Sequence, residues 1–258
     1  MDPIIFDREQ GVGRITLNRP DVLNSFNKAM AKQMQAALDE CASDAEIRAI
    51  YLTGNGRAFS AGQDLAEAIA EDGPELRSIV SDHYNPIIKK IREVEKPVVC
   101  AVNGVAAGAG ANIALACDIV FAANGASFIQ AFSKIGLIPD SGGTFFLPRL
   151  IGPQKAGALM MLGDKVPAVE AERIGMIYRV CADDSLTEEA LGTAVKLAKM
   201  PTKGIGYTKR ALNQSLTNDL NTQLDVEEEL QATAAATHDY QEGVNAFLEK
   251  RKPTFKGA

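Results

Sequence analysis

The sequence predicts an α/β fold with a mainly parallel sheet, followed by a region made only of helices. Two observations lead to this prediction. Short apolar stretches with strand character alternate with helical patterns or glycine-rich turns over most of the chain, as in βα units. From Pro201 onward only helical patterns remain. We therefore expect a core over residues 1–200 and a helical oligomerisation region over residues 201–258, because amphipathic helices bury their apolar faces against a neighbour.

The N-terminal elements begin with a predicted hairpin, in which IIFDRE and RITLN flank a Gly-Val-Gly turn. Apolar residues then recur with helical spacing from Asn27 to Cys41, which predicts an amphipathic helix. The stretch AIYLTG predicts a short buried strand, and the glycine-punctuated loop GNGRAFSAGQDL follows it. A further helix is expected from Tyr84 to Val94, before Pro97.

The middle of the chain contains two predicted strands, VVCAVNG and DIVFA, separated by small residues that become helical from Ala111. The stretch SFIQAFSKIGLIPDSGGT is expected to be irregular, and beyond Phe145 the pattern is mostly helical apart from a strand at MIYRVC. The final region has three helical stretches, which are TKRALNQSL, LDVEEELQATAAATHD and YQEGVNAFLEKRK.

Composition limits the classes of function. Of the 258 residues, 46% are hydrophobic and 23% charged, which is typical of a globular protein. No stretch approaches the roughly 20 apolar residues of a membrane span, and no signal peptide is evident, so a cytoplasmic location is expected. The net charge of −6 disfavours nucleic acid as a partner.

Four cysteines stand far apart in apolar surroundings, which predicts buried thiols in a reducing compartment. The two histidines have no second ligand at metal spacing, so no metal site is predicted.

Two glycine-rich segments, residues 59–65 and 104–110, each follow a predicted strand. If they converge, one backbone N–H from each could hold an oxygen on which negative charge develops. Alternatively, the glycines only permit tight packing of a helix on a strand. Neither segment has the GxxxxGK[ST] pattern of a phosphate loop, and no GxSxG pattern indicates a serine hydrolase.

Asp140 is the third candidate, because it stands between Pro139 and small residues ahead of a predicted helix. In isolation this pattern favours a helix N-cap, and a chemical role for the carboxylate is the alternative.

Five segments together resemble the crotonase (enoyl-CoA hydratase/isomerase) superfamily, in family order and over nearly the whole chain. They are LNRPDVLNSF, LTGNGRAFSAGQDL, KPVVCAVNGVAAGAG, GLIPDSGGTFFLPRLIG and EGVNAFLEKRKPTF. The resemblance implies a spiral of ββα units whose C-terminal helical region forms a homotrimer or a dimer of trimers. It implies no cofactor, since coenzyme A is part of the acyl-CoA substrate.

The resemblance also implies the substrate-binding residues. The thioester carbonyl would lie between the backbone N–H groups of Gln63 and Ala109, and Lys250 would approach the CoA phosphates from a neighbouring subunit. The residues expected beside the adenine and the pantetheine arm are Leu23, Phe59, Ala61, Asp64 and Leu65.

The implied chemistry depends on the number of carboxylates. Hydration conventionally uses two, and the family's hydratases carry glutamates at positions that match Asn112 and Phe132. Isomerisation needs one, and Asp140 matches the aspartate of the family's phenylacetate-pathway isomerases. Phe128 and Phe132 would give it apolar surroundings, which should raise its pKa.

The resemblance therefore predicts an isomerase that converts ring-1,2-epoxyphenylacetyl-CoA to oxepin-CoA, shifts 3-enoyl-CoA to 2-enoyl-CoA, or both. One alternative is a 2-enoyl-CoA hydratase that holds water by other groups. Another is a CoA- or RNA-binding scaffold, which the acidic charge and Asp140 disfavour. Family dehalogenases use an aspartate with a histidine and a tryptophan, and this chain has Phe132 and Asn85 at those positions and no tryptophan.

Overall fold

The computed structural model describes residues 2–258, and its larger sheet has six strands in the order β1-β2-β3-β5-β7-β10. The first two strands form an antiparallel hairpin, and each later neighbour pairs in parallel. The predicted α/β class, with its mainly parallel sheet, is confirmed. The strands are β1 (Ile4–Glu9), β2 (Val12–Leu17), β3 (Ala49–Gly54), β5 (Val98–Val102), β7 (Ile119–Ala123) and β10 (Arg179–Cys181).

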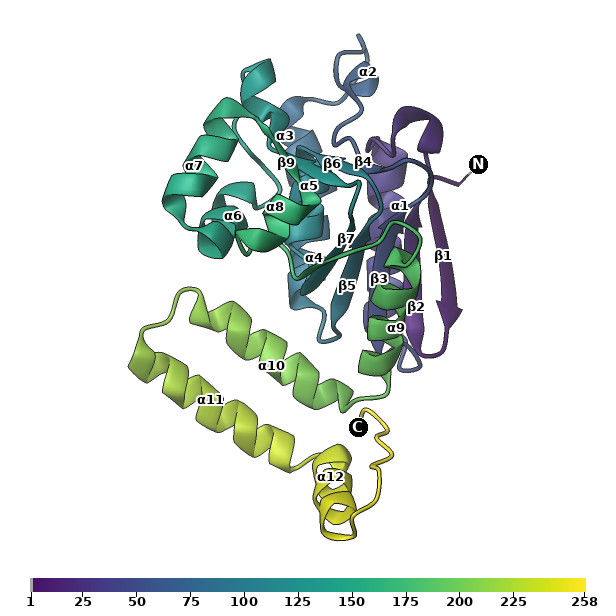
Figure 1. The fold of residues 1–258 in the computed structure, drawn as a ribbon, viewed down its shortest axis with the longest axis vertical. Helices are drawn as coiled ribbons and strands as arrows, with labels where there is room; N and C mark the ends of the chain where they lie inside the picture. The colour runs from purple at the N-terminus through teal and green to yellow at the C-terminus, as the bar shows by residue number, and fades with distance from the viewer. Residues whose placement is uncertain (1) are drawn as a thin grey trace.

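A second, smaller sheet has the order β4-β6-β8-β9 and was not predicted from the sequence. Its first three strands lie in segments expected to be glycine-rich loops or irregular chain, and β9 lies in a stretch expected to be mostly helical. Each of the first three follows a strand of the larger sheet, so the chain makes the same two-strand step three times, as expected for a spiral of ββα units (Figure 1). The strands are β4 (Ala58–Ser60), β6 (Val105–Ala107), β8 (Ser127–Ile129) and β9 (Lys165–Pro167).

The helices of the core fill the connections between these strands. The helix predicted over 84–94 is present, but a π-helical turn over Ile79–Tyr84 runs directly into it. The helix predicted from Ala111 begins two residues earlier. The core helices are α1 (Lys28–Ser43), α2 (Leu65–Ala68), α3 (Leu76–Ser78), α4 (Asn85–Glu93), α5 (Ala109–Leu115), α6 (Gly143–Ile151), α7 (Pro153–Leu162), α8 (Ala168–Arg173) and α9 (Leu186–Ala198).

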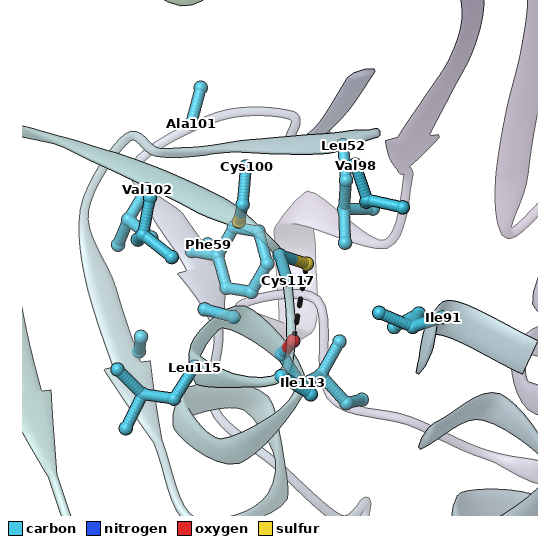
Figure 2. Packing of buried hydrophobic residues seen from close by; sticks show 14 of the residues in the cluster. Leu52, Phe59, Ile91, Val98, Cys100, Ala101, Val102, Ile113, Leu115 and Cys117 are labelled. Carbon is cyan, nitrogen blue, oxygen red and sulfur yellow. Dashed lines mark hydrogen bonds between the residues drawn. The ribbon is translucent and has the colours of Figure 1, made fainter. Parts of the chain in front are cut away.

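The buried hydrophobic core extends from the larger sheet to α1, α4, α5 and α9, and Figure 2 shows the part of it near Phe59. The ring of Phe59 lies beside Cys100 and Cys117, and the Cys117 thiol donates a hydrogen bond to the carbonyl of Ile113 (3.4 Å). All four cysteines are free and buried, as predicted.

Three helices make up the C-terminal region, namely α10 (Thr202–Ser215), α11 (Leu220–Ala235) and α12 (His238–Leu248). The first two run side by side as a helical hairpin away from the spiral (Figure 1). A buried ion cluster joins α10 to the core, because Lys209 Nζ lies 2.7 Å from Asp118 Oδ2. Arg92 contacts the other oxygen of that carboxylate at 3.0 Å.

The chain after α12 turns back to the core. The buried carboxylate of Asp239 accepts hydrogen bonds from the backbone N–H groups of Lys256 and Gly257, both at 2.7 Å. Arg48, ahead of β3, donates to the carbonyl of Phe255 (3.0 Å). Among residues 2–258, none of the helices has both the length and the apolarity that a bilayer crossing requires.

Candidate active site

Two loops converge at the ends of β4 and β6, which pair in parallel. A Cβ placed on Gly62 would lie 2.9 Å from the carbonyl oxygen of Ala107 and 3.4 Å from the nitrogen of Ala109. Gly62 also has a φ of +89°, a conformation that favours glycine. The close approach of the two backbones therefore depends on glycine at this position.

The backbone N–H groups of Gln63 and Ala109 lie at this junction. Their neighbours are occupied, since Gly62 O accepts from Phe26 N (2.7 Å) and Gly108 N donates to Ile129 O (2.9 Å). Within residues 2–258 no acceptor is hydrogen-bonded to either the Gln63 or the Ala109 N–H. Ala109 is the first residue of α5, where an amide has no partner inside the helix. Two free donors on converging loops fit an oxyanion hole.

The Asp140 carboxyl lies in the turn before α6, and it does not cap that helix. The N-cap residue is Gly142, so the capping interpretation is wrong. Asp140 Oδ1 instead accepts from the Ser141 hydroxyl (2.8 Å). Burial raises the pKa of Asp140 above that of an ordinary aspartate, in the direction predicted, and the Ser141 hydrogen bond offsets part of this rise.

Tyr84 connects the carboxylate to the loops, a role that was not predicted from the sequence. Its buried hydroxyl donates to Gln63 Oε1 (2.8 Å), and its ring packs on Phe26 with centroids 5.9 Å apart. The pKa of Tyr84 is well above its usual value, first because of burial and second because the charge of Asp140 is close. Tyr84 is thus a common neighbour of Asp140 and Gln63.

Of the two side chains at the positions that match the hydratase glutamates, Asn112 contacts Asp140 and Phe132 lies against the second loop. Asn112 is fully buried and donates to the backbone carbonyl of Asp140 (2.9 Å). Phe132 is buried, with its ring edge 3.8 Å from where a Cβ of Gly108 would stand. Phe128 is also buried. Asn112 therefore links α5 to the turn that carries Asp140.

Most of the residues expected to contact coenzyme A lie along the first loop. The carbonyl of Leu23 accepts from Ala61 N (2.9 Å), which places these residues side by side. Asp64 caps α2 and pairs with Arg19 (2.9 Å), and Leu65 is half exposed.

Two other expected contacts lie elsewhere. The Phe59 side chain is fully buried in the core (Figure 2), so only its backbone could face a ligand. Lys250 follows α12, at the far end of the molecule from β4 and α5 (Figure 1). In the part of the chain that the structure describes, no group of three His, Cys, Asp or Glu side chains could hold a metal ion.

Both the fold and the sequence define the class of protein. The chain belongs to the enoyl-CoA hydratase/isomerase family, whose model matches residues 7–258. It is therefore an enzyme of a family that processes acyl-CoA thioesters, with the crotonase fold.

Individual relatives of known name and structure can also be compared with this chain. The chain is 48% identical to the 1,2-epoxyphenylacetyl-CoA isomerase of Escherichia coli K12, over 100% of this chain and 99% of that protein. It is 37% identical to the 2,3-dehydroadipyl-CoA hydratase of the same organism, over the full length of both. An enoyl-CoA hydratase structure from Geobacillus kaustophilus superposes with a TM-score of 0.92 at 36% identity, covering 99% of this chain and 98% of that one.

Proposed function

We propose that this enzyme is an isomerase of coenzyme A thioesters that uses Asp140 as its single acid/base. The Gln63 and Ala109 N–H groups would hold the thioester oxygen. The observation that carries this proposal is one carboxylate of raised pKa that shares the neighbour Tyr84 with Gln63, one of the two residues with a free backbone donor. An amide and a phenyl ring, those of Asn112 and Phe132, stand at the positions that match the two glutamates of the family's hydratases.

The proton transfer needs no second carboxylate. Ionised Asp140 removes a proton from the carbon next to the thioester carbonyl, and the negative charge moves to the carbonyl oxygen, where the two N–H groups stabilise it. Protonated Asp140 then returns the proton to a carbon further along the conjugated system. For a 3-enoyl thioester the proton leaves C2 and arrives at C4, which yields the 2-enoyl isomer.

The substrate that we propose first is ring-1,2-epoxyphenylacetyl-CoA, with the 3-enoyl to 2-enoyl shift as an accompanying activity. Support comes from the 48% identity to the Escherichia coli isomerase of that name. In this substrate the same transfer moves a proton from the side chain to the ring while the epoxide opens to the seven-membered oxepin.

The test is an assay of purified protein with 3-enoyl-CoA and with the epoxide, followed by the same assay on Asp140→Asn. We expect isomerisation by the wild type and a loss of at least about 10³-fold in kcat for the variant, which keeps the shape but cannot accept the proton. Full activity of Asp140→Asn would refute the assignment. Rapid hydration of crotonyl-CoA without isomerisation would favour the hydratase instead.

We also propose that the chain assembles as a homotrimer, or as a dimer of trimers, through its C-terminal helices. Large apolar side chains are exposed there, including Phe247 (83%), Leu248 (72%) and Leu212 (61%). In a trimer, Lys250 beside this face would reach the coenzyme of a neighbouring subunit. Light scattering after gel filtration should give three or six times the mass of 27.5 kDa, and a monomeric mass would contradict the proposal.

A further inference from the structure

We infer that Asn112 is a positioning residue, which holds the turn that carries Asp140 in its working geometry. The inference rests on the proposed function of Asp140, and it gives a role to the position where the family's hydratases have a glutamate. Its basis is a chain of buried amide contacts that ends on the Asp140 backbone.

The buried amide contacts consist of two hydrogen bonds. Gln130 Nε2 donates to Asn112 Oδ1 (2.8 Å), and Asn112 Nδ2 donates to the backbone carbonyl of Asp140 (2.9 Å). Asn112 and Gln130 are 0% and 2% exposed, so water does not replace these contacts readily. The residues come from three segments, α5, the end of β8 and the turn before α6, which are far apart in sequence.

The direction of the two bonds is fixed by the carbonyl at the end. A carbonyl oxygen only accepts, so Asn112 must turn its NH₂ toward Asp140 and its oxygen toward Gln130. Gln130 must then present its own NH₂, and its Oε1 is left without a hydrogen-bond partner in the described chain. An unpaired buried oxygen is costly. The unpaired Gln130 Oε1 indicates that this amide orientation is kept because it lets Asn112 Nδ2 donate to the Asp140 carbonyl.

The turn needs this support because its backbone is strained. Ser141 has a φ of +51°, which is unusual for a residue with a side chain, and Gly142 follows with +74°. The carbonyl of Asp140 accepts from Gly143 N (2.8 Å) as well as from Asn112. These two hydrogen bonds fix the peptide plane next to the Asp140 Cα, and thereby limit where the carboxyl can point.

The fit around Asn112 is tight. A Cβ placed on Gly143 would lie within 3.0 Å of three atoms of the Asn112 amide. A carboxylate at position 112 would present an oxygen, in place of N–H, to the Asp140 carbonyl and would repel it. Asn112, at the position of a hydratase glutamate, therefore supports the turn that carries Asp140. A site with Asp140 as its one carboxylate and the strained turn depend on each other.

The experiment compares Asn112→Ala with Asn213→Ala in isomerase assays. Asn213 is the matched control, because its Nδ2 also donates to a backbone carbonyl, that of Arg92 (2.8 Å), but on α10. We expect Asn112→Ala to lower kcat by about 10- to 100-fold, since small misplacements of a catalytic group have effects of this size. KM should stay within about twofold, because the N–H groups of Gln63 and Ala109 are unchanged.

Two further readouts separate positioning from loss of folding. In Asn112→Ala the midpoint of the acid limb of the kcat–pH profile should move to a different pH. A smaller folded fraction would instead lower kcat by the same factor at every pH. In the Asp140→Asn background the same change should cause no further loss of the residual rate. Gln130→Met, which removes the donor to Asn112 but no hydrogen bond to Asp140 or to either loop, should lower kcat in the same direction by a smaller factor.

The outcomes distinguish the two claims. An inactive wild type, or an active Asp140→Asn, would remove the proposed function and this inference with it. If the wild type is active and Asp140 is essential, the inference alone is overturned by wild-type kcat in Asn112→Ala or by losses that add fully to those of Asp140→Asn. Should Asn112→Ala fail to fold, wild-type kcat and pH profile in Gln130→Met would overturn it.

Discussion

Replacing Gly62 with alanine tests directly whether the two converging loops form the oxygen-binding site. The new Cβ would stand 2.9 Å from Ala107 O and 3.4 Å from Ala109 N, at a φ of +89°. The first distance is several tenths of an ångström shorter than an ordinary contact. Because the carbonyl of Ala107 belongs to a paired strand, the substitution should push the two loops apart and widen the gap between the two free N–H groups.

The size of the effect follows from two contributions. Left-handed backbone geometry costs a residue with a side chain roughly 1–2 kcal/mol, which lowers stability. Complete loss of one oxyanion donor costs about 2.7–4 kcal/mol, or 10²–10³ in kcat, and a partial displacement should cost part of this. We therefore expect Gly62→Ala to lower kcat by about 10- to 100-fold and the free energy of unfolding by roughly 1–3 kcal/mol.

The assay follows formation of the conjugated 2-enoyl thioester by its ultraviolet absorbance, beside urea denaturation. Gly56→Ala is a matched control, because it combines a φ of +79° with a 2.9 Å contact to Pro20 and lies outside residues 59–65 and 104–110. The control should lose stability and keep its kcat. Equal kcat in Gly62→Ala, Gly56→Ala and the wild type would refute the reasoning.

Two further predictions concern charge. The raised pKa of Asp140 means that folding favours its neutral form, so its stabilising contribution is present below the unfolded pKa of about 3.9 and is lost as pH rises through the folded pKa. Asp140→Asn should therefore melt at a higher temperature than the wild type near pH 7, and calorimetry at pH 3.5 should show that difference shrinking; a constant difference would contradict the argument. Lys209→Met breaks the buried cluster with Asp118 and should cost about 3–5 kcal/mol in urea denaturation, whereas the exposed Lys203→Met should change little.

The helices and strands defined by local apolar patterns were predicted from the sequence. Apolar periodicity located α1 within two residues, and continuous apolar runs located β3, β5 and β7, because these elements are set by which residues are buried. The strands β4, β6 and β8 were missed, since each has three residues and their glycine-rich surroundings resemble loops.

In the candidate site, too, local segments were predicted and long-range contacts were not. Gln63, Ala109 and Asp140 were singled out from segments and from resemblance, but the Asp140 side chain in isolation favoured a cap that the structure does not contain. Asn112 lies 28 positions from the carbonyl that it contacts, and Tyr84 lies 21 from Gln63. No local pattern predicts such pairings, because they depend on how the turns of the spiral stack.

The attachment of residues 255–257 to Asp239 and Arg48 has a mechanical consequence. The C-terminal region is fixed to the rest of the molecule at its start by the peptide chain, in its first helix by Lys209, and again after α12. Because of these contacts, a pivot about a single hinge at Pro201 would break hydrogen bonds on both sides of α11, and we expect the C-terminal helices to move with the core. Changes in the last four residues would be felt in the orientation of α12, far from any reacting atom.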